Sequence, residues 1–159
     1  MKYQLHRELS RVALEDGSWH IEKIPEDMVQ LKEFLYDVLV DTMNNSLDPD
    51  LKDVLPNKYI ENLTLNRLGD FSRRYIITAI DNEKVIGILI ALPELNKNTF
   101  HIYTLGVSEE YRGKGVGQAL LCRGLNDLSE LDYEDVIIDA HSDNIPALNL
   151  YRKLGFGNK

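Results

Sequence analysis

The sequence predicts an α/β fold in which one mixed sheet carries helices on both faces. Three segments rich in β-branched and aromatic residues follow one another at 75–80, 85–92 and 99–107, and a fourth lies at 136–140. Segments with helical spacing of apolar residues flank them. Strands that alternate with amphipathic helices are typical of a helix-covered sheet. The predicted order is β-α-α-β-β-β-α-β-α, within a single domain that spans residues 1–159.

The N-terminal residues are predicted to form a β-hairpin. Residues 3–14 alternate loosely between apolar and polar, and Asp16-Gly17 offers the backbone a turn with positive φ. A second alternation starts at Trp19. We treat residues 1–18 as an extension that precedes the main body of the domain.

Two helices are expected next. Apolar side chains recur near helical spacing over 26–43, and Glu26 and Asp27 suit the positive end of the helix dipole. Pro56 can open the second helix, which Gly69 should end.

The second half of the sequence is predicted to hold strands and two more helices. The turn-like residues 81–84 join the first two strands of the central group. Apolar periodicity then predicts a helix over 115–130 and another over 144–154, on either side of the last strand.

Composition limits the classes of function. The 159 residues hold 18 Lys and Arg against 26 Asp and Glu, a formal charge of −8 with no basic run, so the electrostatic footprint of a nucleic-acid-binding protein is missing. The N-terminus lacks an apolar signal core, and no segment approaches the ~20 apolar residues of a membrane span. We therefore expect a cytoplasmic protein that does not insert into membranes. Cys122 is the single cysteine, which rules out an intrachain disulfide or a cysteine-based metal cluster, and we expect it to be buried and structural. No metal is expected.

The segment with the clearest chemistry is a basic, glycine-rich turn that leads into the helix predicted at 115–130. Gly113, Gly115 and Gly117 alternate with other residues, so several backbone N–H groups can approach one anion. The helix start adds unpaired N–H donors, and Arg112 and Lys114 add positive charge. This turn is predicted to hold a diphosphate.

Two other readings of the turn fit less well. A Walker loop would need Gly-Lys-Ser/Thr at its end, which is absent, and a dinucleotide fingerprint would open a βαβ unit instead of following a long N-terminal half. A phosphate- or nucleotide-binding protein of another fold stays open on these grounds.

Two segments resemble the GNAT superfamily, the GCN-related N-acetyltransferases. Arg112-Gly113-Lys114-Gly115-Val116-Gly117 looks like its acyl-CoA signature, Gln/Arg-x-x-Gly-x-Gly/Ala, and residues 144–156 resemble the helix after its fifth strand. The resemblance implies that the donor pyrophosphate lies on the backbone amides of 112–117. It also implies that the pantetheine arm pairs with the main chain of Leu105, Gly106 and Val107.

The resemblance further implies roles in catalysis. The family places a tyrosine such as Tyr151 near the acyl-CoA sulfur, where its phenol can protonate the departing thiolate, the alternative being a core tyrosine. Asn144 either contacts the pantetheine arm or caps the helix. His101 falls where many relatives carry a glutamate, so it is the candidate base beside Tyr103, although it could equally pack locally.

Further details of the strands bear on these roles. The two-residue period predicts that His101 and Tyr103 share a strand face with Leu105 and Val107. His141, at the end of the strand predicted at 136–140, is a weaker candidate for the base, and His6 and His20 have no supporting sequence context.

Family domains usually continue after the Leu-Gly-Phe segment with two more strands, and this sequence stops three residues later, so these strands are expected to be missing. The edge of the strand at 136–140 would then be covered by residues 1–18 or by a partner subunit in a homodimer. The predicted activity is transfer of an acetyl group from acetyl-CoA to an amine of a small molecule or protein. The alternative is a non-catalytic acyl-CoA-binding or regulatory module.

Overall fold

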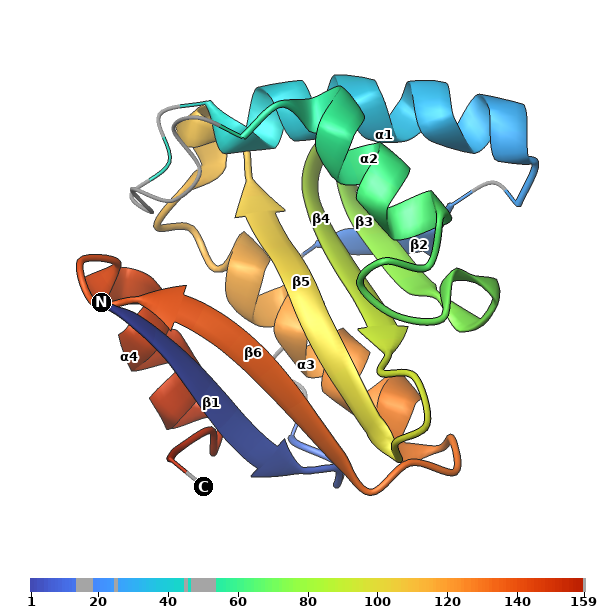
Figure 1. Ribbon diagram of the computed structural model, residues 1–159. Helices are drawn as coiled ribbons and strands as arrows, with labels where there is room; N and C mark the ends of the chain where they lie inside the picture. Colours follow the sequence, from blue (N-terminus) through green and yellow to red (C-terminus); the bar gives the residue numbers. More distant parts are fainter. Residues whose placement is uncertain (14–18, 25, 45, 47–53, 159) are drawn as a thin grey trace.

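A computed structural model of the chain describes residues 1–13, 19–24, 26–44, 46 and 54–158, and these build a six-stranded mixed sheet with helices on both faces (Figure 1). The strands are β1 (Lys2–Glu8), β2 (His20–Lys23), β3 (Tyr75–Asp81), β4 (Lys84–Pro93), β5 (Thr99–Val107) and β6 (Asp135–His141). The helices are α1 (Met28–Met43), α2 (Pro56–Thr64), α3 (Val116–Ser129) and α4 (Ile145–Lys153), with short 3-10 turns η2 (Phe71–Arg73) and η3 (Glu109–Tyr111). Across the sheet the strands run in the order β1-β6-β5-β4-β3-β2. The predicted fold class is confirmed.

The helices begin and end for local reasons. The Asp27 carboxylate caps α1 by accepting from two amides of its first turn. α2 begins at Pro56 as predicted but ends at Thr64, before Gly69, because Asn66 adopts a positive φ of 58° that breaks the helix. None of the helices in the described part of the chain is long and apolar enough to cross a membrane.

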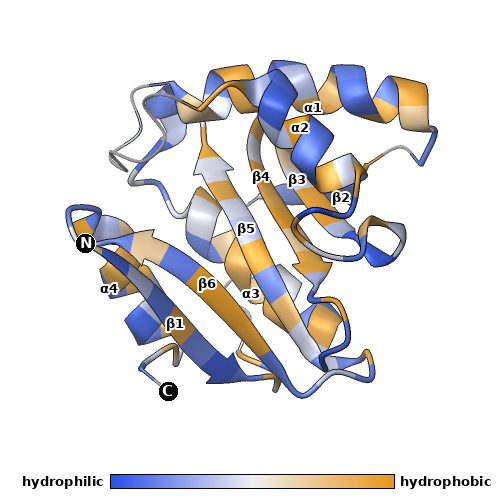
Figure 2. Ribbon diagram, viewed as in Figure 1, coloured by the Kyte–Doolittle hydropathy of each residue, from blue (hydrophilic) through white to orange (hydrophobic). Residues whose placement is uncertain are grey.

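The sheet separates two hydrophobic cores, and the central strand β4, buried along most of its length, contributes apolar side chains to both of them. Figure 2 shows apolar residues along β3 and β4, whereas β1 is largely hydrophilic. On one face α1 and α2 pack on β4, through residues that include Leu35, Leu63, Ile88 and Ile90. On the other face α3 and α4 pack against the sheet. Leu120, Leu125 and Leu148 of these helices share this core with Leu89 and Ala91 of β4. Cys122 is buried in α3, as expected.

The predicted N-terminal hairpin is wrong, because β1 and β2 lie at opposite edges of the sheet. β1 pairs antiparallel with β6 along its whole length, from Lys2 opposite His141 to Glu8 opposite Asp135, whereas β2 pairs with β3. The predicted turn at Asp16-Gly17 lies outside the described residues. A turn signal is local, but the partner of each strand is chosen by long-range burial.

The N-terminal strand covers the edge of β6, which is one of the two covers proposed from the sequence. Leu5 of β1 is 1% exposed and belongs to the core on the α3 side. After α4, the described residues add one isolated bridge, in which Gly157 exchanges backbone hydrogen bonds of 2.8 and 2.9 Å with His6 on the outer side of β1. The absence of two family strands and the homodimer stay predictions.

The sheet splits between its two parallel strands. β5 and β6 pair only from Thr99 with Asp135 to Ile102 with Ile138, whereas β4 stays paired with β5 as far as Val107. Beyond Ile102, the edge of β5 that faces β6 has no strand partner among the described residues. An extended ligand with amide groups could pair with this edge.

A bulge in β5 corrects the predicted strand face. Tyr103 is the residue that the ladder with β4 skips, and one extra residue reverses the alternation of side chains. His101 stacks on Tyr103, which packs against the core of α1 and α2, whereas Leu105 and Val107 pack on the α3 side. The four residues therefore do not share one face.

Candidate active site

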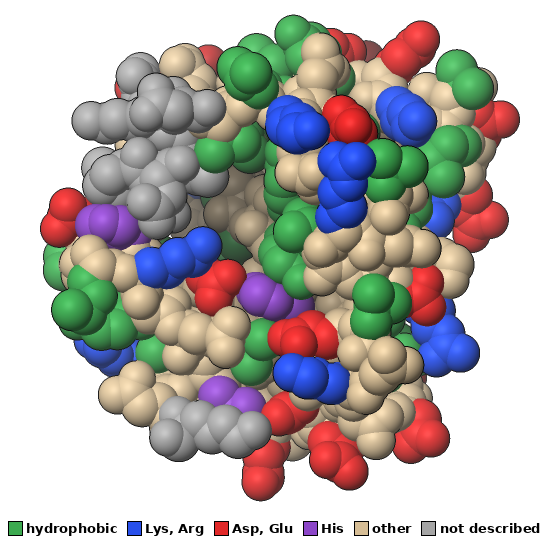
Figure 3. Space-filling view, viewed as in Figure 1, with side chains coloured by type: hydrophobic (Ala, Val, Ile, Leu, Met, Phe, Trp, Pro, Cys, Tyr) green, Lys and Arg blue, Asp and Glu red, His purple; other side chains and the backbone are tan. Residues whose placement is uncertain are grey.

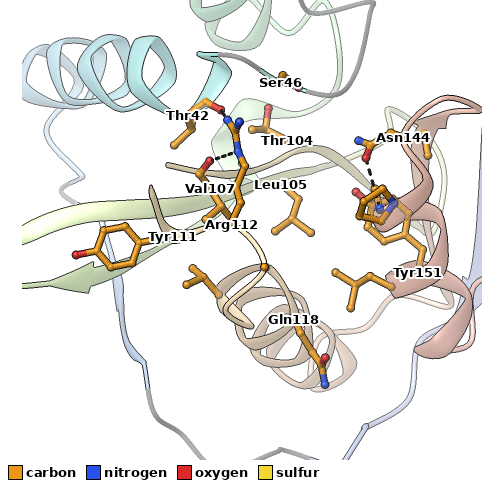
Figure 4. A pocket seen from close by; sticks show the side chains of 18 of the residues that line it. Thr42, Ser46, Thr104, Leu105, Val107, Tyr111, Arg112, Gln118, Asn144 and Tyr151 are labelled. Atoms are coloured by element: carbon orange, nitrogen blue, oxygen red, sulfur yellow. Dashed lines mark hydrogen bonds between the residues drawn. The ribbon is translucent and has the colours of Figure 1, made fainter. Parts of the chain in front are cut away.

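A cavity of about 540 Å³ opens where β5 and β6 separate, and Figure 3 shows the surface hollowed there. Its wall comes from the end of α1, from β5, from the glycine-rich turn with the start of α3, and from β6 and α4 (Figure 4). It brings together most of the predicted site residues: Tyr103, Leu105, Gly106, Val107, Arg112, Gly113, Gly115, Val116, Gly117, Asn144 and Tyr151. His101 and Lys114 do not line it.

The glycine-rich turn has the backbone geometry of an anion cradle. Gly113 and Gly115 adopt φ of 75° and 88°, and a Cβ added at either would meet no atom within 4 Å on the protein side. Gly115 is the N-cap of α3 and, lacking a side chain, leaves the first-turn amides without a side-chain cap. The turn and the helix start therefore point uncapped N–H groups and a partial positive charge at one place beside the cavity.

Gly117 differs from these two glycines. Its φ lies outside the left-handed region, and an added Cβ would sit 3.8 Å from Leu150 and from Val107, an ordinary contact distance. The protein itself thus has room for alanine at this position. Any need for glycine here would come from a ligand that approaches the backbone of α3.

The side chain of Arg112 is held by backbone carbonyls of the protein, whereas the sequence predicted that its charge would help to hold a diphosphate. Its guanidinium donates to the carbonyl oxygen of Val107 at 3.0 Å (Figure 4) and to those of Thr42 at 3.2 Å and Asn44 at 2.7 Å. These bonds fasten the end of β5 to the C-terminus of α1, where a cation is also favoured by the helix dipole. The sequence shows that the loop carries an arginine, but it does not show which acceptors the N–H groups of its guanidinium contact.

Two further contacts join the same elements. The Ser108 hydroxyl donates to Asp41 of α1, and an added Cβ at Gly106 would come within 3.0 Å of Thr42. Glycine at 106 therefore permits the close approach of α1 to β5. Lys114, in contrast, lies outside the cavity with its Nζ 5.5 Å from the centroid of the Tyr111 ring.

The helix α4 presents Asn144 and Tyr151 to the cavity from the side opposite Arg112 (Figure 4). Asn144 is the N-cap of α4, and its Oδ1 accepts from the amide of Ala147 at 3.4 Å. The capping alternative is thus present, and the residue also lines the cavity. Tyr151 is 6% exposed and tilts against Phe156, with ring centroids 6.1 Å apart. As predicted, both residues lie on one face of the helix.

The two candidates on β5 are held by neighbours. The Tyr103 hydroxyl donates to the carbonyl of Leu68, and burial, with the charges of Glu94 and Asp139, raises the pKa of the phenol to about 12. His101 is 8% exposed and its Nε2 lies 2.9 Å from Asp139 Oδ2. This geometry favours a structural role for Tyr103. The His101 ring contacts Asp139, which lines the cavity, but does not itself line the cavity.

Comparison with known proteins decides the family. The sequence profile of the acetyltransferase (GNAT) family matches residues 33–156. The chain belongs to the GNAT family. Its members are acetyl-CoA-dependent acyltransferases, so the predicted enzyme class is confirmed.

Individual relatives agree with this assignment. The chain is 31% identical over 114 residues to an N-alpha-acetyltransferase of Sulfurisphaera tokodaii, covering 64% of this chain and 67% of that relative. A GNAT acetyltransferase of Staphylococcus aureus superposes with a TM-score of 0.68 at 20% identity, over 88% of this chain and 85% of its own. The PaiA N-acetyltransferase of Thermoplasma acidophilum, in complex with coenzyme A, gives 0.62 at 19%, over 89% and 91%. The two structures show likeness of fold.

Several residues of the cavity wall were not singled out from the sequence, and Asp139 is the charged one among them. Asp139 of β6 lines the cavity, and its side chain is 25% exposed. Burial alone would raise the pKa of its carboxyl, but the hydrogen bond and charge of His101, together with Lys2 and Gln4, lower it. A carboxylate in the apolar strand Val-Ile-Ile-Asp-Ala was the signal that could have drawn attention to it.

The other histidines lie apart from the cavity wall. His141 at the end of β6 accepts from the amide of Asp143 at 3.0 Å, His6 is 2.7 Å from Asp135, and His20 is 2.6 Å from Glu22. None of the three lines the cavity. Among the described residues, no group of His, Cys, Asp and Glu could hold a metal ion.

Proposed function

We propose that the chain is an N-acetyltransferase that moves the acetyl group of acetyl-CoA to an amine within the split between β5 and β6. The observation that carries this proposal is the single cavity that joins the glycine cradle to Tyr151 and Asn144. Membership of the GNAT family and the N-alpha-acetyltransferase relative support it.

The donor would use backbone groups more than side chains. The diphosphate would lie on the amides of 113–117 and the start of α3, where Gly113 and Gly115 have positive φ and a Cβ added at either would meet no other described part of the protein within 4 Å. The pantetheine arm would pair with the free edge of β5 at 105–107, and Asn144 borders its path. The residues present therefore fit acetyl-CoA.

The transfer needs one proton donor at the sulfur. The uncharged nitrogen of the acceptor attacks the thioester carbonyl carbon, the C–N bond forms and the C–S bond breaks. The phenol of Tyr151 gives its proton to the departing thiolate and regains one from the attacking nitrogen, directly or through water. The further proton that an ammonium acceptor carries leaves to a base or to solvent, and His101 could contribute only through Asp139, which stands between it and the cavity.

The acceptor that we favour is the α-amine of a polypeptide. The relative named an N-alpha-acetyltransferase supports this class, and amine-bearing small molecules are the second candidate. A non-catalytic acyl-CoA-binding module is the alternative from another class, and only turnover separates it from the enzyme.

Thiol release from acetyl-CoA tests the proposal. Three acceptors are compared. The first is a lysine-containing peptide with a free α-amine, the second is that peptide with its α-amine blocked by a formyl group, so that only the internal lysine offers an amine, and the third is a polyamine. We expect the free peptide to be acetylated fastest, with the product confirmed by mass spectrometry. Saturable acetyl-CoA binding without transfer to any amine would instead establish the regulatory module.

A further inference from the structure

Asp139 occupies the inner end of the split. It follows directly after Ile138, the last residue of β6 that pairs with β5, so it stands where the two strands begin to part. Val136, Ile138 and Ala140 belong to the core on the α3 side, which turns Asp139 to the opposite face of the sheet. Its carboxylate therefore borders the cavity and remains partly open to solvent.

Three side chains hold this carboxylate from two neighbouring strands. His101 of β5 lies 2.9 Å from Oδ2, and Gln4 of β1 donates to Oδ1 at 3.3 Å. The ammonium of Lys2, also on β1, lies 3.9 Å from Oδ2, so the carboxylate already attracts a cation from the solvent side. A carboxylate offers about four acceptor sites, so the two hydrogen bonds leave capacity for a further donor beside Lys2.

We propose that Asp139 binds the acceptor through its ammonium group and thereby selects cationic amines over neutral ones. This inference rests on the proposed acetyl transfer and names the residue that recognises the acceptor. The formal charge of −8 favours approach of a cation to the molecule, and the position of Asp139 directs it into the cavity that holds Tyr151. The N-terminal strand thus contributes to the site, because Gln4 and Lys2 orient the carboxylate.

The chain offers a matched control at Asp135. It lies four residues earlier on the same face of β6 and likewise bridges β1 and β5, with Oδ2 2.7 Å from His6 Nε2 and Oδ1 2.6 Å from Thr99 Oγ1. It does not line the cavity. Asp135→Asn therefore alters a cross-strand carboxylate without touching the proposed acceptor site, and asparagine preserves the shape of the side chain in both variants.

The experiment compares wild type, Asp139→Asn and Asp135→Asn. Calorimetry on protein saturated with coenzyme A measures binding of two probes, an alkylamine that is cationic at pH 7 and an arylamine of similar size that is neutral. Steady-state assays then give KM for both amines and for acetyl-CoA. Binding is read without turnover, so failure of the acetyl transfer and failure of this inference are told apart.

The expected result is specific to one variant and one probe. Asp139→Asn should weaken alkylamine binding and raise its KM about 10- to 100-fold, the loss expected for a charge-assisted contact. Arylamine binding and the KM for acetyl-CoA should stay within about twofold, and Asp135→Asn should change none of these values. Equal weakening of both amines by Asp139→Asn, or unchanged alkylamine binding, would overturn the inference.

Discussion

The Tyr151 hydroxyl is the one side-chain group to which the proposed chemistry assigns a proton transfer. The residue is buried on α4 and borders the cavity, while its ring packs against Phe156. We expect Tyr151→Phe to lower kcat about 100-fold, since general acid catalysis contributes about 10²–10⁴-fold, with the dissociation constant of acetyl-CoA within about twofold. Stopped-flow or steady-state assays with calorimetry measure both values.

Tyr111 provides the control. It also lines the cavity, but its hydroxyl donates to Asp81 at 2.8 Å, away from the split. Tyr111→Phe should leave kcat nearly unchanged. If both variants lost activity equally, the effect would belong to the cavity wall and not to a proton on Tyr151.

Substitutions at Gly117 distinguish an effect on acetyl-CoA binding from an effect on the stability of the fold. Because an added Cβ meets only ordinary contacts, and alanine favours helix by about 0.5–1 kcal/mol over glycine, Gly117→Ala should fold at least as stably as wild type. Because the acyl-CoA signature accepts alanine at this position, Gly117→Ala should also retain acetyl-CoA binding, whereas the branched side chain of Gly117→Val should weaken it about 10-fold or more by blocking the approach to the backbone. Thermal unfolding and calorimetry give the two quantities.

Gly124 on the same helix should behave in the opposite way. Its added Cβ would lie 3.1 Å from Leu89 Cδ1 in the core. Because Leu89 is fully buried and close-packed, this crowding should outweigh the helical preference for alanine, so Gly124→Ala should lower the melting temperature and leave acetyl-CoA affinity intact. Wild-type affinity in Gly117→Val would contradict the placement of the donor on this turn.

At the scale of elements, α1 is fastened to the end of β5 by the fork of Arg112. Lysine keeps the positive charge but cannot donate to three carbonyls in this geometry. Arg112→Lys should therefore lower the free energy of unfolding by about 1–3 kcal/mol, measured by urea denaturation. Lys114→Ala, which removes a loop charge without these bonds, should change it by less than about 0.5 kcal/mol. Unchanged stability in Arg112→Lys would show that the carbonyl bonds are unimportant.

The N-terminal strand is an integral part of the sheet. Leu5 is 1% exposed, so Leu5→Ala should reduce the free energy of unfolding by about 2–5 kcal/mol and expose β1 to proteases. Val40→Ala, on the outer face of α1 where the side chain is 48% exposed, is the control and should cost less than about 0.5 kcal/mol. A cost below about 1 kcal/mol for Leu5→Ala would mean that β1 is a detachable extension.

These elements also show what the sequence could predict. The strand bounds 75–80 and 99–107 and the helix start at Pro56 depend on local patterns, and the structure confirms them within a residue or two. The partner of β1 and the bulge at Tyr103 depend on which distant residues bury one another. Local turn signals and an unbroken strand period carried no information about either feature.

The same division holds for the site. The glycines of the turn and the Asn144–Tyr151 face of α4 were predicted because motif spacing fixes them. Asp139 and the carbonyl bonds of Arg112 were missed, since each is defined by contacts between segments far apart in the chain.

At the scale of the whole molecule, two halves of one sheet meet at the split. β2 to β5 carry α1 and α2 on one face, whereas β6 and α4 form the other wall of the cavity and β1 pairs with the outer edge of β6 (Figure 1). The parallel pair β5 and β6 joins these halves over four residues of each strand and then separates. We propose that backbone donors of the turn and of the free β5 edge converge on one elongated ligand.

Calorimetric titration of the full chain with acetyl-CoA, and separately with ATP, tests that claim most directly. Both ligands carry an adenine nucleotide and a polyphosphate, but only acetyl-CoA has the pantetheine arm that would pair with β5. We expect saturable binding of one acetyl-CoA per chain and at least about 100-fold weaker binding of ATP, a difference of ~2.7 kcal/mol. Equal binding of the two ligands, or no binding of acetyl-CoA, would contradict it.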